Sequence, residues 1–262
     1  MQSFEWEGFD PFDRIPDSTT ALTLREYVPL ETLEKLPLTT LKVTNFDKKS
    51  VAEPSYIFES AHLRSNITAL DLTGFRQFGD WHLLPQHLTH LSLDLDSALQ
   101  LEACIEQLSL LRLKSLTFLF GECTAYDVPT LLLPQTALQT LFIYGHTFFE
   151  DIESVAYAIA NMSSLTSCYL LVDKGEPDYW IPIAQALEHL PLQVLNWHAR
   201  PLYNEPDHVF SLLTGLAPTL KQLYLTHLQL PHEDVPRLHQ LQTLDLTVDD
   251  MTFASLPDLL AG

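Results

Sequence analysis

One hydrophobic phrase recurs nine times in this chain of 262 residues. It consists of an aliphatic residue, two variable residues, a leucine or once a cysteine, one variable residue and an apolar residue. The copies are Leu38-Leu41-Val43, Ile67-Leu70-Leu72, Leu88-Leu91-Leu93, Leu113-Leu116-Phe118, Leu138-Leu141-Ile143, Leu165-Cys168-Leu170, Leu192-Leu195-Trp197, Leu220-Leu223-Leu225 and Leu241-Leu244-Leu246. Their starts lie 21 to 29 residues apart, the period of proteins built from stacked repeats. The phrase therefore predicts one elongated solenoid rather than two compact domains.

Each copy of the phrase predicts a short β-strand. Its last two fixed positions are two residues apart, so their side chains point to the same face of a strand and the side chains between them to the other. Stacked parallel strands would bury the leucine face and leave the alternate face open. The segments between copies show helical spacing of apolar residues in 98–108, 151–162, 180–190 and 208–216. We expect Asp207 to cap the last helix, and the 21-residue repeats to return through extended or 3₁₀ turns.

The spacing resembles that of the leucine-rich repeat family, with irregular repeats of 21–29 residues over nearly the whole chain. This resemblance implies an α/β horseshoe with a parallel concave sheet and convex helices or 3₁₀ turns. The chain departs from the family at the position three residues beyond each phrase, where the family has Asn or Cys. That position holds Phe46, Phe75, Asp96, Gly121, His146, Asp173, Arg200, Leu228 and Asp249. We therefore expect irregular turns without a ladder of buried asparagines.

The phrases divide the chain into three parts. Residues 38–249 carry the repeats, 1–37 are expected to form an N-terminal cap, and 250–262 a C-terminal cap, because the end repeats of a solenoid must cover their core. The N-terminal part contains one degenerate turn at Thr19-Leu22-Leu24. Alternatively, the aromatic residues between Phe4 and Phe12 form an acidic tail that docks into a partner.

The charge of the chain is strongly negative and restricts its partners. It has 14 Lys and Arg against 34 Asp and Glu, a formal net charge of −20. Residues 115–262 hold four of these basic and 17 of the acidic residues, which leaves −13. Such a surface repels nucleic acid and attracts basic proteins. The alternative is that the charge only maintains solubility.

The sequence carries few signs of chemistry or of membrane attachment. Three cysteines lack metal-binding spacing, and their scarcity indicates a reducing, cytoplasmic environment. We see no signal peptide, no apolar stretch of membrane-spanning length, and no glycine-rich phosphate loop or Gly-x-Ser-x-Gly motif. We therefore expect no cofactor, no metal, no catalytic residues and no membrane partner. A cysteine–histidine pair formed by Cys123 with His146 or His198 is the minority alternative of an enzyme built on a solenoid.

The outward positions of the predicted strands change character along the chain. They are small, polar or charged in the first three phrases. From the fourth to the eighth they become aromatic and apolar: Leu119, Phe142, Tyr144, Tyr169, Leu171, His198 and Tyr224. With strands about 4.8 Å apart, this set would extend over roughly 20 Å. Tyrosine and other large aromatics dominate the energy of protein interfaces. Alternatively, these side chains shield the sheet, or another part of the chain covers them.

These observations lead to one functional expectation with several rivals. We expect a non-enzymatic protein–protein interaction module that binds a basic protein through its concave face. The more specific alternatives are an immunity-type inhibitor of a toxin and an effector or adaptor that recruits a cellular target.

Overall fold

The computed structural model describes residues 3–6, 15–25, 28–44, 54–73, 80–95, 105–120, 128–145, 151–172, 180–199, 206–226 and 237–247. Its centre is one sheet of 11 strands, all parallel and ordered as in the chain. The strands are β1 (Ser3–Trp6), β2 (Ala21–Leu24), β3 (Thr40–Val43), β4 (Ala69–Leu72), β5 (His90–Leu95), β6 (Ser115–Phe120), β7 (Thr140–Gly145), β8 (Ser167–Val172), β9 (Val194–Ala199), β10 (Gln222–Thr226) and β11 (Thr243–Thr247). The predicted α/β solenoid with a parallel sheet is thus confirmed.

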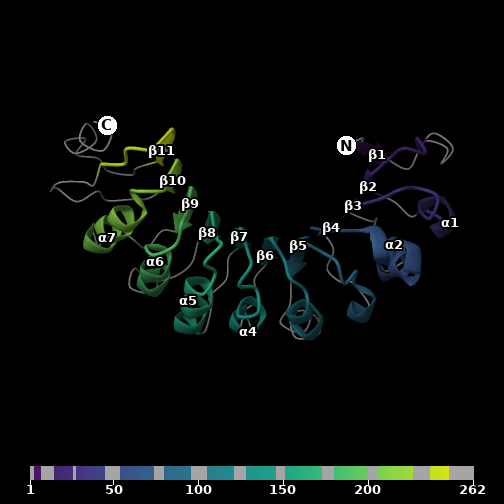
Figure 1. Cartoon of the computed structure of the whole chain (residues 1–262), viewed down its shortest axis with the longest axis horizontal. Helices are drawn as coiled ribbons and strands as arrows, with labels where there is room; N and C mark the ends of the chain where they lie inside the picture. Colours follow the sequence, from purple (N-terminus) through teal and green to yellow (C-terminus); the bar gives the residue numbers. More distant parts are fainter. Residues whose placement is uncertain are drawn as a thin grey trace.

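Helices connect the strands along the outside of an arc (Figure 1). They are α1 (Leu30–Leu33), η2 (Pro54–Glu59), α2 (Ala61–Asn66), η3 (Trp81–Leu83), α4 (Val128–Leu132), α5 (Ile152–Ala160), α6 (Ile181–Leu187) and α7 (Pro206–Leu216), and residues 105–110 are also helical. The strands follow the inner side of the arc, and β1 and β11 lie at its two ends (Figure 1). The sheet face turned away from the helices is therefore concave.

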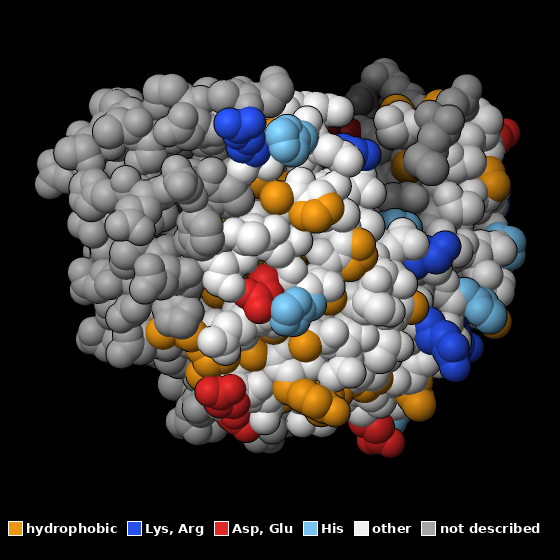
Figure 2. Space-filling model, turned by 60° about the vertical axis from the view of Figure 1, so that its left-hand side comes forward, with side chains coloured by type: hydrophobic (Ala, Val, Ile, Leu, Met, Phe, Trp, Pro, Cys, Tyr) orange, Lys and Arg blue, Asp and Glu red, His pale blue; other side chains and the backbone are white. Residues whose placement is uncertain are grey.

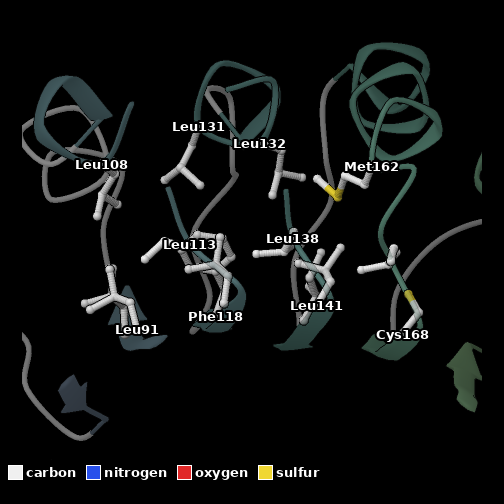
Figure 3. Close-up of a cluster of buried hydrophobic side chains, with 14 of the residues drawn as sticks. Leu91, Leu108, Leu113, Phe118, Leu131, Leu132, Leu138, Leu141, Met162 and Cys168 are labelled. Carbon is white, nitrogen blue, oxygen red and sulfur yellow. The ribbon is translucent and has the colours of Figure 1, made fainter. Parts of the chain in front are cut away.

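The core lies between the sheet and the helices. In Figure 3, strand leucines face side chains from the helical side of the arc, with Leu91 on the side of Leu108 and Leu141 on the side of Leu132. The register repeats the phrase from strand to strand, as in Leu91↔Leu116 and Leu116↔Leu141. Each leucine thus packs against its counterparts in the neighbouring repeats, so the core is continuous along the arc.

Hydrogen bonds before each strand extend the ladder by one residue. The carbonyl oxygen of Thr20 accepts from the backbone N–H of Thr39 (2.9 Å) and Thr40 (3.1 Å). Equivalent pairs recur in every later repeat, up to the Lys221 carbonyl, which accepts from the two residues that open the next repeat at 2.7 and 3.1 Å. Threonine hydroxyls add a third donor in several repeats, as Thr89 does at 3.2 Å. These bonds satisfy the backbone where the strands begin and fix their parallel register.

The helix predictions were mostly correct. Helix α5 begins after Asp151, whose carboxylate accepts from the Ser154 backbone N–H at 3.0 Å. Helix α6 lies inside the predicted segment 180–190, and the 3₁₀ helix η3 returns a 21-residue repeat as expected. Helix α7 starts at Pro206, so Asp207 lies within the helix and its assignment as the N-cap was wrong. Proline favours the first helical position because it needs no hydrogen-bond acceptor for its nitrogen.

The N-terminal 37 residues contribute two strands to the sheet. Leu22 and Leu24 of β2 pair in register with Leu41 and Val43 of β3, so the degenerate phrase forms a strand like the others. Strand β1 precedes it, with Phe4 opposite Leu22. Residues 250–262 and the nine positions at which the family has Asn or Cys lie outside the described ranges.

Candidate functional site

The seven side chains predicted to form a binding surface lie on the concave face of strands β6 to β10. We call them the aromatic patch: Leu119, Phe142, Tyr144, Tyr169, Leu171, His198 and Tyr224. In β7, Leu141 and Ile143 are fully buried, whereas Phe142 is partly buried and Tyr144 is 47% exposed. This alternation gives each strand a core side and a concave side, as the phrase predicted.

The repeat with a cysteine in place of leucine keeps the same phase. Cys168 and Leu170 are 0% and 1% exposed, and Tyr169 and Leu171 are partly buried on the opposite side of the strand. A slip of one residue would exchange these two sets and remove Tyr169 from the patch. The structure thus places all seven residues on one face.

The register arranges the patch in two rows across the strands. The first row runs through Phe142, Tyr169, Asn196 and Tyr224 and ends at Asp245 of β11. The second row, two residues further along each strand, consists of Leu119, Tyr144, Leu171 and His198. Strands β6 to β10 are separated by four spacings of about 4.8 Å, so the patch extends over about 19 Å.

Two rings of the first row are packed together. The centroids of Phe142 and Tyr169 are 5.5 Å apart, with an angle of 31° between the ring planes. Burial raises the pKa of Tyr169, and the nearby Tyr224 and Cys168 groups raise it further. The phenol of Tyr169 therefore remains protonated, and a hydrogen-bond donor, at physiological pH.

The N-terminal part of the concave face differs from the patch because it carries opposite charges in pairs. Arg25 donates to Glu5 between β2 and β1, and Lys42 Nζ lies 2.7 Å from Asp71 Oδ2 between β3 and β4. Such pairs compensate each other and contribute little to the net field.

The C-terminal part of the face has an acidic balance. Strands β5 to β11 contain two carboxylates, Asp94 and Asp245, and no Lys or Arg within their described bounds. Asp94 lies beside Leu119 of the patch and Asp245 beside Tyr224, so a carboxylate flanks the patch at each end. Figure 2 turns the C-terminal end of the arc towards the viewer and shows hydrophobic, acidic, basic and histidine side chains interspersed on that side of the molecule. An aromatic centre between carboxylates suits a cationic ligand.

The described residues show little that would serve catalysis. Burial raises the pKa of Cys168 to about 12, so its thiol is not ionised at neutral pH. Among the described residues, no three His, Cys, Asp or Glu side chains are grouped as metal ligands. Cys123 and His146, two of the three residues considered for a cysteine–histidine pair, lie outside the described ranges. In the described part of the chain, no helix has the length and apolarity needed to cross a membrane.

Sequence reasoning missed two features around the patch. Asn196 separates Tyr169 from Tyr224 in the first row, and the aromatic set predicted from the sequence did not include this interruption. Behind the sheet, Trp197 packs edge-on against Trp180 with centroids 6.4 Å apart and an angle of 76°. The signal for the first feature was present in the alignment of the repeats, where a short amide interrupts a run of aromatic residues.

Comparison with known proteins gives no assignment for this chain. No protein-family model matches it, and no curated protein sequence is similar to it.

Proposed function

We propose that this chain is a protein-binding module of the leucine-rich repeat kind, without enzymatic activity of its own, that holds a basic protein on the concave side of β6 to β10. The observation that carries the proposal is the aromatic patch, which lies on the open face of the sheet between two carboxylates. The strand–helix repeats and the concave parallel sheet support the assignment to leucine-rich repeats.

The size of the surface suits a protein partner. A stable interface buries about 800 Å² on each side, with a few central residues supplying most of the energy. The patch extends over about 19 Å, and the whole sheet, with ten spacings of about 4.8 Å, follows about 48 Å of the arc. The patch would form the apolar centre of such an interface, and the polar strands on either side its rim.

The charge of the chain favours a basic partner. The net charge is −20, and strands β5 to β11 contain two carboxylates and no Lys or Arg within their described bounds. Attraction between opposite surfaces accelerates association and weakens as salt shortens the Debye length, which is about 8 Å at physiological ionic strength.

A paired substitution tests the proposal. The protein, carrying an affinity tag, is used to capture partners from its source cells, and the captured basic protein is then titrated against purified variants. We expect Tyr169→Ala combined with Tyr224→Ala to weaken binding at least about tenfold, because each ring is a potential hot spot. The matched control, Ser92→Ala with Thr117→Ala, changes the same outward column on β5 and β6 and should leave binding within about twofold.

The rate at which the partner associates with the protein tests whether charge contributes to binding. The association rate should fall as NaCl is raised from 50 to 500 mM. Binding that survives the tyrosine substitutions would show that the partner does not use this surface, and an association rate independent of salt would show that charge does not attract it.

A further inference from the structure

The first row of the aromatic patch contains one interruption. Phe142 and Tyr169 occupy adjacent strands and stack on each other with centroids 5.5 Å apart, which leaves no room between them. Tyr169 and Tyr224 are instead separated by the whole of β9, where the register places Asn196 between them. A short amide side chain therefore lies between two tyrosines.

The spacing of these two tyrosines suits a flat cation. Their strands lie two spacings, or about 9.6 Å, apart at the backbone. A planar group sandwiched between two rings needs about 7–8 Å between the ring planes, which is two contacts of 3.5–4.0 Å. Figure 1 shows that the sheet is concave on this side, and side chains that project straight from a concave surface converge towards their tips. Burial is the main cause of the raised pKa of Tyr169, and Tyr224 contributes to it.

The polar groups around this position accept hydrogen bonds and carry negative charge. The amide oxygen of Asn196 is an acceptor, and Asp245 follows Tyr224 directly in the row. His198 lies two residues from Asn196 on the same strand. An arginine guanidinium presents five donors in one plane and stacks on aromatic faces, whereas a lysine ammonium is compact and strongly hydrated.

We propose that Tyr169 and Tyr224 hold an arginine side chain of the partner between their rings, above Asn196 and beside Asp245. The proposal rests on the proposed binding of a basic protein and specifies how its charge is recognised. Phe142 supports the arrangement, because its contact with Tyr169 limits the movement of that ring away from the arginine.

Two peptides of equal charge test this proposal. Hexa-arginine and hexa-lysine are titrated into the whole protein at 50 mM NaCl and at 150 mM NaCl. We expect hexa-arginine to bind about tenfold more tightly, as a desolvated cation–π contact allows. Asn196→Phe fills the position between the rings and Tyr224→Leu removes one ring. Each should reduce the preference to about twofold or less, since the sandwich is then lost. The matched control, Ser92→Phe, introduces the same ring in the same column on β5 and should keep the preference.

The outcomes separate the two proposals. Loss of the arginine preference in every folded variant of Asn196→Phe and Tyr224→Leu, with retention in Ser92→Phe, supports the arginine site. Equal binding of the two peptides by the unsubstituted protein, or a preference that survives in either folded variant, overturns the site and leaves the basic partner standing. Binding of neither peptide at 50 mM NaCl overturns both the site and the basic character of the partner. Thermal unfolding of each variant shows whether it is folded, and one folded variant suffices for the comparison.

Discussion

Replacing Gly215 with alanine should destabilise the C-terminal repeats, even though alanine is the better helix former. Gly215 lies in α7, and a Cβ atom added there would lie 2.3 Å from the backbone oxygen of Glu188 and 3.0 Å from its Cβ. Gly215 is exposed to solvent, but a methyl group added to it would point at Glu188, the residue that ends α6. The contact is with backbone, so no rotation of a side chain relieves it.

The magnitude follows from the distance. Relief to 3.0 Å, the shortest separation that Cβ atoms show, requires a shift of at least 0.7 Å, since 3.0 − 2.3 = 0.7. Helix α7 cannot move freely, because Leu212, Leu213 and Leu216 anchor it in the core at 1%, 1% and 0% exposure. Such overpacking costs about 1–3 kcal/mol, and the gain in helix propensity is about 1 kcal/mol. We therefore expect a net loss of up to about 2 kcal/mol.

A urea titration monitored by circular dichroism measures this loss in the free energy of unfolding. Gln185→Ala, at an exposed position of α6, is the matched control and should change stability by less than about 0.5 kcal/mol. An increase in stability for Gly215→Ala, as expected at an unhindered helical glycine, would refute the close approach of α7 to Glu188.

Three further predictions concern the core, a helix cap and the buried thiol. Leu195→Ala should lower the free energy of unfolding by about 2–5 kcal/mol in the same urea titration, because this side chain is fully buried; a loss below about 1 kcal/mol would place it outside the core. Asp151→Ala should lower the melting temperature at pH 7 by removing the cap of α5. Because hydrogen bonds from Ser154 lower the pKa of Asp151 from 3.8, the difference from the unsubstituted protein should shrink as the pH falls below 3.8 and the carboxylate is protonated. A difference that stays constant as the pH is lowered would refute the cap. In a variant with Cys104 and Cys123 replaced by serine, Cys168 should resist a thiol reagent at pH 8 until the protein unfolds. The contribution of Cys168 to stability should decline between pH 9.0 and about 12, because in that range its thiol ionises in the unfolded protein and not in the folded one. Rapid labelling of the folded variant would contradict the burial of Cys168.

The repeat phrase predicted the strands well because it encodes two periods at once. The alternation within a phrase defines the core side of each strand, and the distance between phrases defines the stacking order. Even Cys168, which breaks the leucine pattern, remains in the core because a thiol is small and apolar enough to replace leucine there. Strand β1 escaped prediction because its four residues contain no phrase, and its pairing with β2 depends on backbone hydrogen bonds that any side chains permit.

The candidate site was predicted at the level of positions but not of distances. The column that contains Tyr169, Asn196 and Tyr224 follows from counting residues. The contact between Phe142 and Tyr169 depends on cross-strand register and on ring orientation. The register also places Asn196 between Tyr169 and Tyr224, so that these two tyrosines lie two strands apart. These quantities arise from packing between repeats that lie 27 or 28 residues apart in the chain.

The most direct test of the proposed binding surface is site-specific photo-crosslinking in the source cells. A benzophenone amino acid replaces Tyr144, which is 47% exposed on the concave face, or Tyr157, which is 65% exposed on the convex helix α5. Both positions are exposed tyrosines, so the two variants differ mainly in the face that they probe. We predict a discrete adduct with a basic protein from position 144 and none from position 157. An adduct from position 157 alone, or an acidic protein at position 144, would contradict it.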